Sequence, residues 1–443
     1  MPSKYNHWGA LTIAIAIVVG TVAWSGFARA ENRHLLDDTS WDGGGLASAS
    51  VDPAGRIRPA PHSPPSQGTL EESITKAIKR NEISDTRSSD LDSTEETQRM
   101  IAAATAAVDP PQAILDACLA NDNAGKPGGH VFNRYVWCAR NKIAGQTIKY
   151  PPGEISGQFV APYRVIALAN PFYRNVHYYL HVDDLEDRGN FSASSPLTIQ
   201  VGCRDLNVGC SADKDQITHE LGDWKNEGWV DWNLTSDETA SPQRPEKMLR
   251  NNFSMLGHAT DNIGIDVDLD TWTKPNFRCD SAPYFLTKAC VFTDVIPRLN
   301  YVYGDGYDEV IDHIRRAQYH PDQTYPQKTG KVIPGRYPPP SWDDGLFRVK
   351  YKGATWKLNK AAKDATCPGL PPPTQGQDCD EYPFASTKQG AGLGDGNFSV
   401  QYLNASQNRS AGGKLPGYYT WDRIFYWDSV QKPALDEFWV KAG

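Results

Sequence analysis

The stretch CDEYPFASTKQGAG, residues 379–392, places two carboxylates side by side between a cysteine and a Tyr-Pro-Phe segment, and it ends in a glycine-rich run. Adjacent like charges repel, and aromatic neighbours make each carboxyl group harder to ionise, so the pair is unfavourable unless something binds it. A bound cation would stabilise both charges. Asp380 and Glu381 are therefore the first candidate site residues.

The sequence after this stretch predicts a strand, a turn and a helix. Apolar and polar residues alternate over 398–402, which is typical of a strand. Residues 404–408 are interpreted as a turn. A short helix is expected next, although two glycines and Pro416 lower its intrinsic helical propensity, so packing must stabilise it.

This order resembles the NucA/NucB-type secreted bacterial deoxyribonucleases. The resemblance is carried by DEYP at 380–383, QGAG at 389–392 and QNRSAGG at 407–413. It is strong over about residues 378–428 and looser back to Val291, where VIDHIRRA is similar to the family's leading helix. It implies a compact ββα-metal-like nuclease domain, within an α+β chain, that cleaves DNA with Mg²⁺ or Mn²⁺.

The resemblance also implies roles for particular residues. Asp380 and Glu381 would bind the cation and activate water, and Asn408 would be a further ligand or orient the site. Arg409 would face the scissile phosphate, and Lys414 would reach a neighbouring phosphate. Hydrolysis of a phosphodiester needs these functions, because a hard cation polarises the phosphate, a base activates water and a positive group stabilises the developing charge.

Two histidines near the expected leading helix are weaker candidates. The segment YDEVIDHIRRAQYH, residues 307–320, has apolar residues at helical spacing. His313 and His320 are interpreted as structural, because histidines beside core residues of a helix usually are. Supplying a base or a phosphate contact is the alternative.

A basic run precedes the acid pair. RVKYKGATWKLNKAAK, residues 348–363, contains no acid and interleaves lysines with Tyr351 and Trp356, a mixture that suits phosphate contact and base stacking. The alternative is a solvated strand edge, since lysines protect edges. The lysines predicted to bind substrate are Lys350, Lys352, Lys357 and Lys360.

The charge of the whole chain does not exclude a polyanion as substrate. The formal net charge is −8 over 443 residues. Residues 291–443 hold 18 Lys and Arg against 17 Asp and Glu, so the acidity belongs to the preceding part of the chain.

Eight cysteines fall in close sequential couples, which predicts nearest-neighbour disulfides and an oxidising compartment. Zinc is the less favoured alternative, because no Cys-x-x-Cys is present. The predicted pairs are Cys118–Cys138, Cys203–Cys210, Cys279–Cys290 and Cys367–Cys379.

The first thirty residues predict export. Lys4 precedes the apolar run GALTIAIAIVVGTVAW, and Ala28-Arg29-Ala30 is an A-x-A cleavage pattern. Cleavage there would start the mature, secreted bacterial protein at Glu31 and leave no stable membrane span. An uncleaved anchor is the alternative.

The predicted organisation of the whole chain is a signal peptide at 1–30, a disordered leader at 31–100, a helical connecting segment at 101–154, a β-rich, sandwich-like domain at 155–290 and the nuclease domain at 291–443.

The β-rich domain has no predicted chemistry of its own. Alternating patterns over 155–275 indicate strands, and a cell-wall or protein ligand is the expected partner. Two other functions remain open: a catalytically inactive surface-binding protein, and an interbacterial nuclease toxin with an immunity partner.

Overall fold

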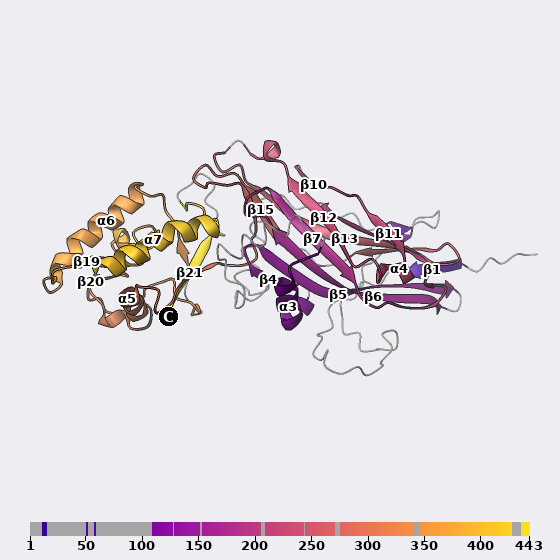
Figure 1. Ribbon diagram of the computed structural model, residues 1–443, viewed down its shortest axis with the longest axis horizontal. Coiled ribbons are helices and arrows are strands. Elements are labelled where there is room, and N and C mark those ends of the chain that lie inside the picture. Colours follow the sequence, from indigo (N-terminus) through magenta and orange to yellow (C-terminus); the bar gives the residue numbers. More distant parts are fainter. Residues whose placement is uncertain are drawn as a thin grey trace, which may run out of the picture. The chain divides into compact units, whose positions relative to one another are not determined.

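In the computed structural model the chain folds into two compact units (Figure 1). The chain as described is mixed α+β, with more strands than helices. The first unit ends at Asp294. The second runs from Val295 to Gly443 and includes Pro283–Leu286. The residues described are 11–15, 50–51, 57–58 and 109–443, without 127, 151–152, 205–208, 243, 271–274, 341–344 and 428–435.

The described residues of the first unit are mainly in strands. Its α-helices among these residues are α3 (Gln112–Ala120) and the short α4 (Leu221–Trp224). Its strands are β1 (Leu11–Ile15), β2 (Ser50–Val51), β3 (Ile57–Arg58), β4 (His130–Asn133), β5 (Val136–Tyr150), β6 (Glu154–Ala169), β7 (Asn175–Val182), β8 (Glu186–Gly189), β9 (Pro196–Arg204), β10 (Cys210–Ala212), β11 (Ile217–Glu220), β12 (Trp229–Ser236), β13 (Leu249–Thr260), β14 (Asp266–Asp270), β15 (Asn276–Asp280) and β16 (Ala289–Phe292).

Two antiparallel sheets form its core. One has the order β1-β5-β6-β7-β12-β10, with β4 beside β5 and β8 beside β6; the other has the order β11-β9-β13-β15-β16, with β14 beside β13. Their inner faces meet where the Phe253 ring lies 5.5 Å from Trp137 and 4.9 Å from Tyr178. Because strand side chains alternate between faces, Tyr178 points into this core while its neighbours on β7 point away. The β-rich, two-sheet character was therefore predictable from the alternating patterns.

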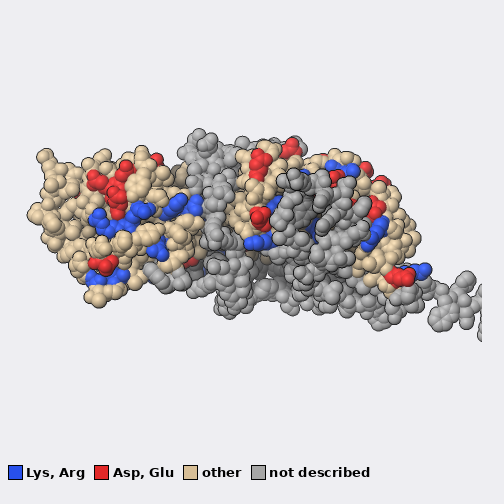
Figure 2. All heavy atoms as spheres, turned by 90° about the horizontal axis from the view of Figure 1, so that it is seen from below, with Lys and Arg blue, Asp and Glu red and all other residues tan. Residues whose placement is uncertain are grey.

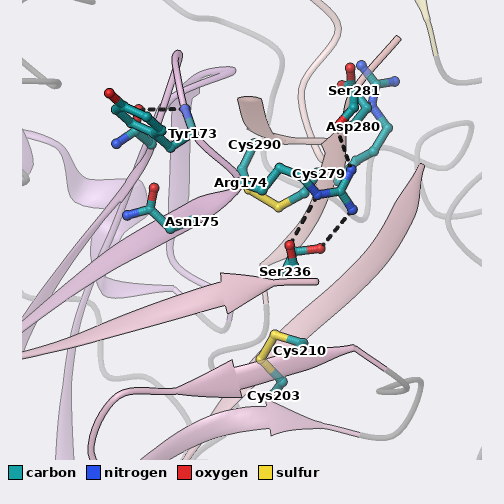
Figure 3. Close-up of a disulfide and its surroundings, with 12 residues drawn as sticks. Tyr173, Arg174, Asn175, Cys203, Cys210, Ser236, Cys279, Asp280, Ser281 and Cys290 are labelled. Atoms are coloured by element: carbon teal, nitrogen blue, oxygen red, sulfur yellow. Dashed lines mark hydrogen bonds and ion pairs between the residues drawn. A yellow bond between two sulfur atoms is a disulfide. The ribbon is translucent and has the colours of Figure 1, made fainter. Parts of the chain in front are cut away.

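A buried arginine joins three strand ends of this unit. The Arg174 guanidinium donates to the backbone and hydroxyl oxygens of Ser236, at 3.1 Å each, and to the Ser281 hydroxyl at 3.3 Å. Figure 3 shows it beside the Cys279–Cys290 disulfide. A buried charge is tolerated when its donors are satisfied, so this network fixes the ends of β7, β12 and β15 relative to one another.

The eight cysteines lie in four pairs at disulfide distance, and these are the four pairs that the spacing predicted: Cys118–Cys138, Cys203–Cys210, Cys279–Cys290 and Cys367–Cys379.

The structure corrects two predicted boundaries. The described part of the segment 101–154 is only partly helical, because β4 and β5 follow α3 and pair within the large sheet. The helical prediction overlooked the cross-strand partners that β6 supplies. The boundary predicted at 290 moves to Asp294, since β16 extends to Phe292 and pairs with β15. The predicted signal peptide and leader lie outside the described residues, apart from β1, β2 and β3.

The second unit surrounds a two-stranded ribbon with helices. Its elements are β17 (Arg298–Tyr301), α5 (Asp308–Tyr319), β18 (Leu346–Phe347), α6 (Ala354–Thr366), β19 (Gln377–Tyr382), β20 (Ser399–Asn404), α7 (Ala405–Trp421) and β21 (Glu437–Ala442). β19 and β20 pair antiparallel, whereas β17, β21 and β18 form a separate sheet. The predicted helix over 307–320 is present as α5, and its apolar stripe of Val310, Ile311, Ile314 and Ala317 packs in the core with Tyr382 and Phe438.

Two local predictions in this unit are wrong. The turn expected at 404–408 is the first turn of α7, because the Asn404 side chain accepts hydrogen bonds from the Ser406 and Gln407 amides and caps the helix. The strand edge considered for the basic run is instead α6 from residue 354 onward. Among the described residues, none of the helices has both the length and the apolar character needed to cross a membrane.

Candidate functional site

The acid pair lies on β19, and strand geometry separates its two members. Successive side chains of a strand point to opposite faces, so Asp380 and Glu381 belong to different sides of the β19–β20 ribbon. Asp378, Asp380 and Tyr382 share the side against which α5 and α7 pack, here called the His313 face. Cys379 and Glu381 point to the other side, covered by α6 and here called the Lys363 face.

On the His313 face, Asp380 is held by a buried histidine. His313 Nδ1 lies 2.7 Å from Asp380 Oδ2, and His313 Nε2 lies 2.8 Å from the Ser399 hydroxyl oxygen. His313 is completely buried, and about an eighth of the Asp380 side chain is exposed, at 12%. Because both ring nitrogens have partners inside the protein, His313 is placed to orient Asp380 rather than to meet a substrate.

The arginine predicted to face phosphate lies on the same face but further out. Arg409 Nε donates to Asp378 Oδ2 at 2.9 Å, and Nη2 donates to Oδ1 at 3.3 Å. Its side chain is 74% exposed. Asn408 is half-buried on the same turn of α7. The helix start is tied to α5, because Glu309 accepts a hydrogen bond from the Asn404 amide at 2.7 Å.

On the Lys363 face, Glu381 lies beside lysines of α6. Lys363 Nζ is 4.0 Å from Glu381 Oε2 and 2.9 Å from Asp364 Oδ1. Burial, and then the charge of Asp380, raise the pKa of Glu381 to about 7, although Lys363 and Lys360 act to lower it. A carboxyl group that titrates near neutral pH can exchange a proton during a reaction at that pH.

The glycine-rich run next to the acids makes room for α6. The Asn359 side-chain amide donates to the Ala385 and Thr387 carbonyls at 2.8 Å, and its oxygen accepts from the Gly392 amide at 2.9 Å. A Cβ at Gly390 would lie 2.5 Å from the Asn359 amide nitrogen. The run therefore allows a buried asparagine of α6 to bind the loop backbone, and Cys367–Cys379 joins the end of the same helix to β19.

The other predicted substrate contacts are spread over this unit. Lys350, Lys352 and Lys357 are exposed and Lys360 is partly buried. Lys414 lies against aromatic rings, donating to the Tyr307 hydroxyl at 3.0 Å. His320 is exposed at the end of α5.

The charge map supports a mixed surface. On the face of Figure 2, the C-terminal unit shows lysine and arginine side chains next to acidic ones rather than one large basic patch.

The predicted metal ligands come from two elements. Asp380 points to the His313 face of β19, Glu381 points to the Lys363 face, and Asn408 lies in the first turn of α7. Among the residues that the structure describes, no group of three or more His, Cys, Asp or Glu side chains is arranged to hold a metal ion.

Two residues of the site carried little sequence signal. His313 was interpreted as structural, yet its ring touches Asp380 directly. Lys363 was one basic residue among several, and only its helical position relative to β19 distinguishes it. The similarity of the 310–317 segment to a family helix was the one signal that singled out His313.

Comparison with known proteins identifies the C-terminal region. Residues 346–424 match the family model described as Deoxyribonuclease NucA/NucB, a stretch that includes α6, β19, β20 and α7. No curated protein and no solved structure matched the chain in the same comparisons. The C-terminal region therefore carries a NucA/NucB-type deoxyribonuclease domain.

Proposed function

We propose that the protein is a secreted, metal-dependent endonuclease that hydrolyses phosphodiester bonds of DNA. The observation that carries this proposal is the family match over 346–424, because it contains both acids and two of the three helices that surround them, α6 and α7. The match favours a nuclease over a purely surface-binding protein. Four disulfide pairs support an extracellular location, since such bonds persist in oxidising compartments.

In this proposal β19, β20 and α7 are the ββα core of the nuclease. The two strands pair antiparallel and α7 follows β20 without a loop. The Asn404 cap and the contact from Glu309 fix the angle at which α7 leaves the ribbon. The packing of Ala411, Tyr418 and Tyr419 in the core stabilises α7 despite Pro416 in its interior.

The two acids have separate roles in this proposal. Asp380, oriented by His313, is the carboxylate that we expect to contact Mg²⁺ or Mn²⁺, since hard cations prefer oxygen ligands. Glu381 is the candidate base, because its pKa of about 7 suits proton transfer at neutral pH. Lys360 and Lys363 stabilise the ionised form of Glu381, because their charges act to lower its pKa. When bound, the cation would polarise the phosphate and stabilise the leaving oxygen.

Plasmid cleavage by the full chain tests this function. We expect nicking with Mg²⁺ or Mn²⁺ and none with EDTA. Asp380→Asn keeps the size of the side chain but removes its charge, so we expect a loss of rate of at least about a hundredfold. Asp322→Asn, which removes an exposed carboxylate from the same unit, is the matched control and should cleave like the parent.

Two results would contradict the proposal. Cleavage that continues unchanged in EDTA would exclude metal dependence. A folded Asp380→Asn protein that cuts at the parent rate would remove Asp380 from the catalytic centre, with folding judged by an unchanged thermal transition.

A further inference from the structure

An aromatic pair, with Tyr351 exposed and Trp356 partly buried, lies where the chain enters α6. Tyr351 is 61% exposed, and its ring contacts that of Trp356 edge to face, with centroids 5.2 Å apart. The Lys352 amine lies 5.2 Å from the centre of the Tyr351 ring. A large aromatic side chain that leaves most of its surface in water, next to a cation, is typical of a binding surface rather than of a core.

This aromatic pair is connected to the candidate base by one stripe of α6. Trp356, Lys360 and Lys363 recur at helical spacing and so lie on the same side of the helix. At a rise of 1.5 Å per residue, Trp356 and Lys363 are about 10 Å apart along the axis. Lys363 in turn lies 4.0 Å from Glu381. A ligand extended along the stripe would therefore meet the rings and then the partly exposed Lys360, whereas the Lys363 and Glu381 side chains are only 9% and 14% exposed.

The positive charge of this surface favours the binding of a polyanion. No acid occurs between Gly345 and Lys363, and Lys350, Lys352 and Lys357 are exposed. Lysines beside aromatic rings are the combination with which proteins hold single-stranded nucleic acid, since the lysines contact phosphates and the rings stack on bases. In a duplex the faces of the bases are covered by their neighbours, so a ring can stack only on an unpaired base.

We propose that the Tyr351–Trp356 pair stacks on an unpaired base and that this surface makes single-stranded DNA the preferred ligand of the nuclease unit. The proposal rests on the function proposed above and specifies the form of its substrate. A surface that held phosphates alone would not distinguish an unpaired strand in this way.

Binding by the full chain in EDTA tests the proposal without cleavage. Fluorescence anisotropy would compare labelled oligothymidylate with a duplex of the same length. We expect the parent to bind the single strand more tightly, and Tyr351→Ala to weaken that binding about tenfold while changing duplex binding less. Tyr351→Phe, which keeps the ring, should bind like the parent. Tyr173→Ala removes an exposed tyrosine of the other unit and should change neither affinity.

The proposal is overturned if Tyr351→Ala weakens both ligands equally or neither, or if the parent binds the duplex as tightly as the single strand. A thermal transition equal to that of the parent verifies the fold of each variant. Metal-dependent plasmid cleavage by the parent is measured in parallel. Its absence would refute the proposed function, whereas cleavage together with an unaffected Tyr351→Ala protein would refute only the preference for single strands.

Discussion

The two faces of the β19–β20 ribbon place neighbouring acids in opposite surroundings. On the His313 face, Asp380 contacts a buried imidazole at 2.7 Å, and a serine hydroxyl holds the other ring nitrogen. On the Lys363 face, Glu381 lies near ammonium groups and has a pKa of about 7. Environment therefore distinguishes two carboxylates that are adjacent in the chain, which is the usual basis for separate roles in acid and base chemistry.

Strand geometry separates side chains that are adjacent in the sequence. From the sequence alone, two neighbouring acids suggest a single charged site. Because side chains alternate across a strand, the two acids face opposite sides of the ribbon, where Asp380 contacts His313 and Glu381 lies near Lys363. If the two faces act separately, a substitution on one face should leave the measured properties of the other face unchanged.

The largest effect is expected from the disulfide that joins α6 to β19 on the Lys363 face. Cys367 ends α6, and Cys379 precedes Asp380 on β19. Replacing both by Ser should lower the free energy of unfolding of this unit by about 2 to 5 kcal/mol, because the cross-link restricts the unfolded chain. Chemical denaturation would measure the loss.

The Cys203–Cys210 pair of the other unit, replaced in the same way, is the control and should leave cleavage unchanged. A parent-like transition in the Cys367/Cys379 variant would show that α6 is held by packing alone.

The titration of Glu381 should appear in the dependence of stability on pH. Its folded pKa of about 7 exceeds the ordinary value of 4.5, so between these values the folded protein binds more protons than the unfolded one. Stability therefore falls as pH rises through this window, by on the order of 3 kcal/mol in total. Glu381→Gln, measured by denaturation in EDTA, should flatten this slope. An identical pH dependence of the parent and the variant would contradict the raised pKa.

Lys363 offers a way to shift this titration. Its ammonium acts to lower the pKa of Glu381, so Lys363→Gln should move the end of the pH window above 7. Lys357→Gln removes the same charge from an exposed position on α6 and should leave the window unchanged. Equal shifts in both variants would indicate a general effect of charge rather than a contact at 4.0 Å.

His313 should affect the other face only. Removing its ring by His313→Ala leaves the buried oxygen of Asp380 without its donor, which typically costs about 1 to 3 kcal/mol of stability. We expect this loss in denaturation experiments together with slower cleavage, while the pH window assigned to Glu381 stays where it is. His320→Ala, at the exposed end of α5, is the matched control. A moved pH window would show that the two faces are coupled.

Much of the architecture was predictable because it follows local patterns. The alternation over 155–275 predicted strands, the spacing of Val310, Ile311 and Ile314 predicted α5, and the cysteine spacing predicted the disulfide pairs. In each case the signal is contained within a few neighbouring residues. The β4–β5 hairpin was missed because its stability depends on β6, a partner that no local pattern reveals.

The site was harder to predict because its contacts cross the sequence. His313 and Asp380 are separated by 67 positions, and only the packing of α5 on the ribbon brings them together. The glycine-rich run was one of the motifs that carried the family resemblance, and in the structure it accommodates Asn359. Residue type indicated candidate side chains but did not predict which of them touch.

The smallest effect is expected at Arg409. Its ion pair with Asp378 is exposed, and such pairs contribute at most about 1 kcal/mol to stability, so Arg409→Ala should barely change the thermal transition. Turnover is the sharper measurement. If Arg409 meets the phosphate during cleavage, its loss should lower kcat more than it raises KM, since it would act on charge that develops in the transition state. Asp378→Asn breaks the same ion pair but keeps the guanidinium. We therefore expect Asp378→Asn to cleave faster than Arg409→Ala. Equal rates in the two variants would mean that Arg409 serves the ion pair alone, and the His313 face would then have to stabilise the phosphate by another group.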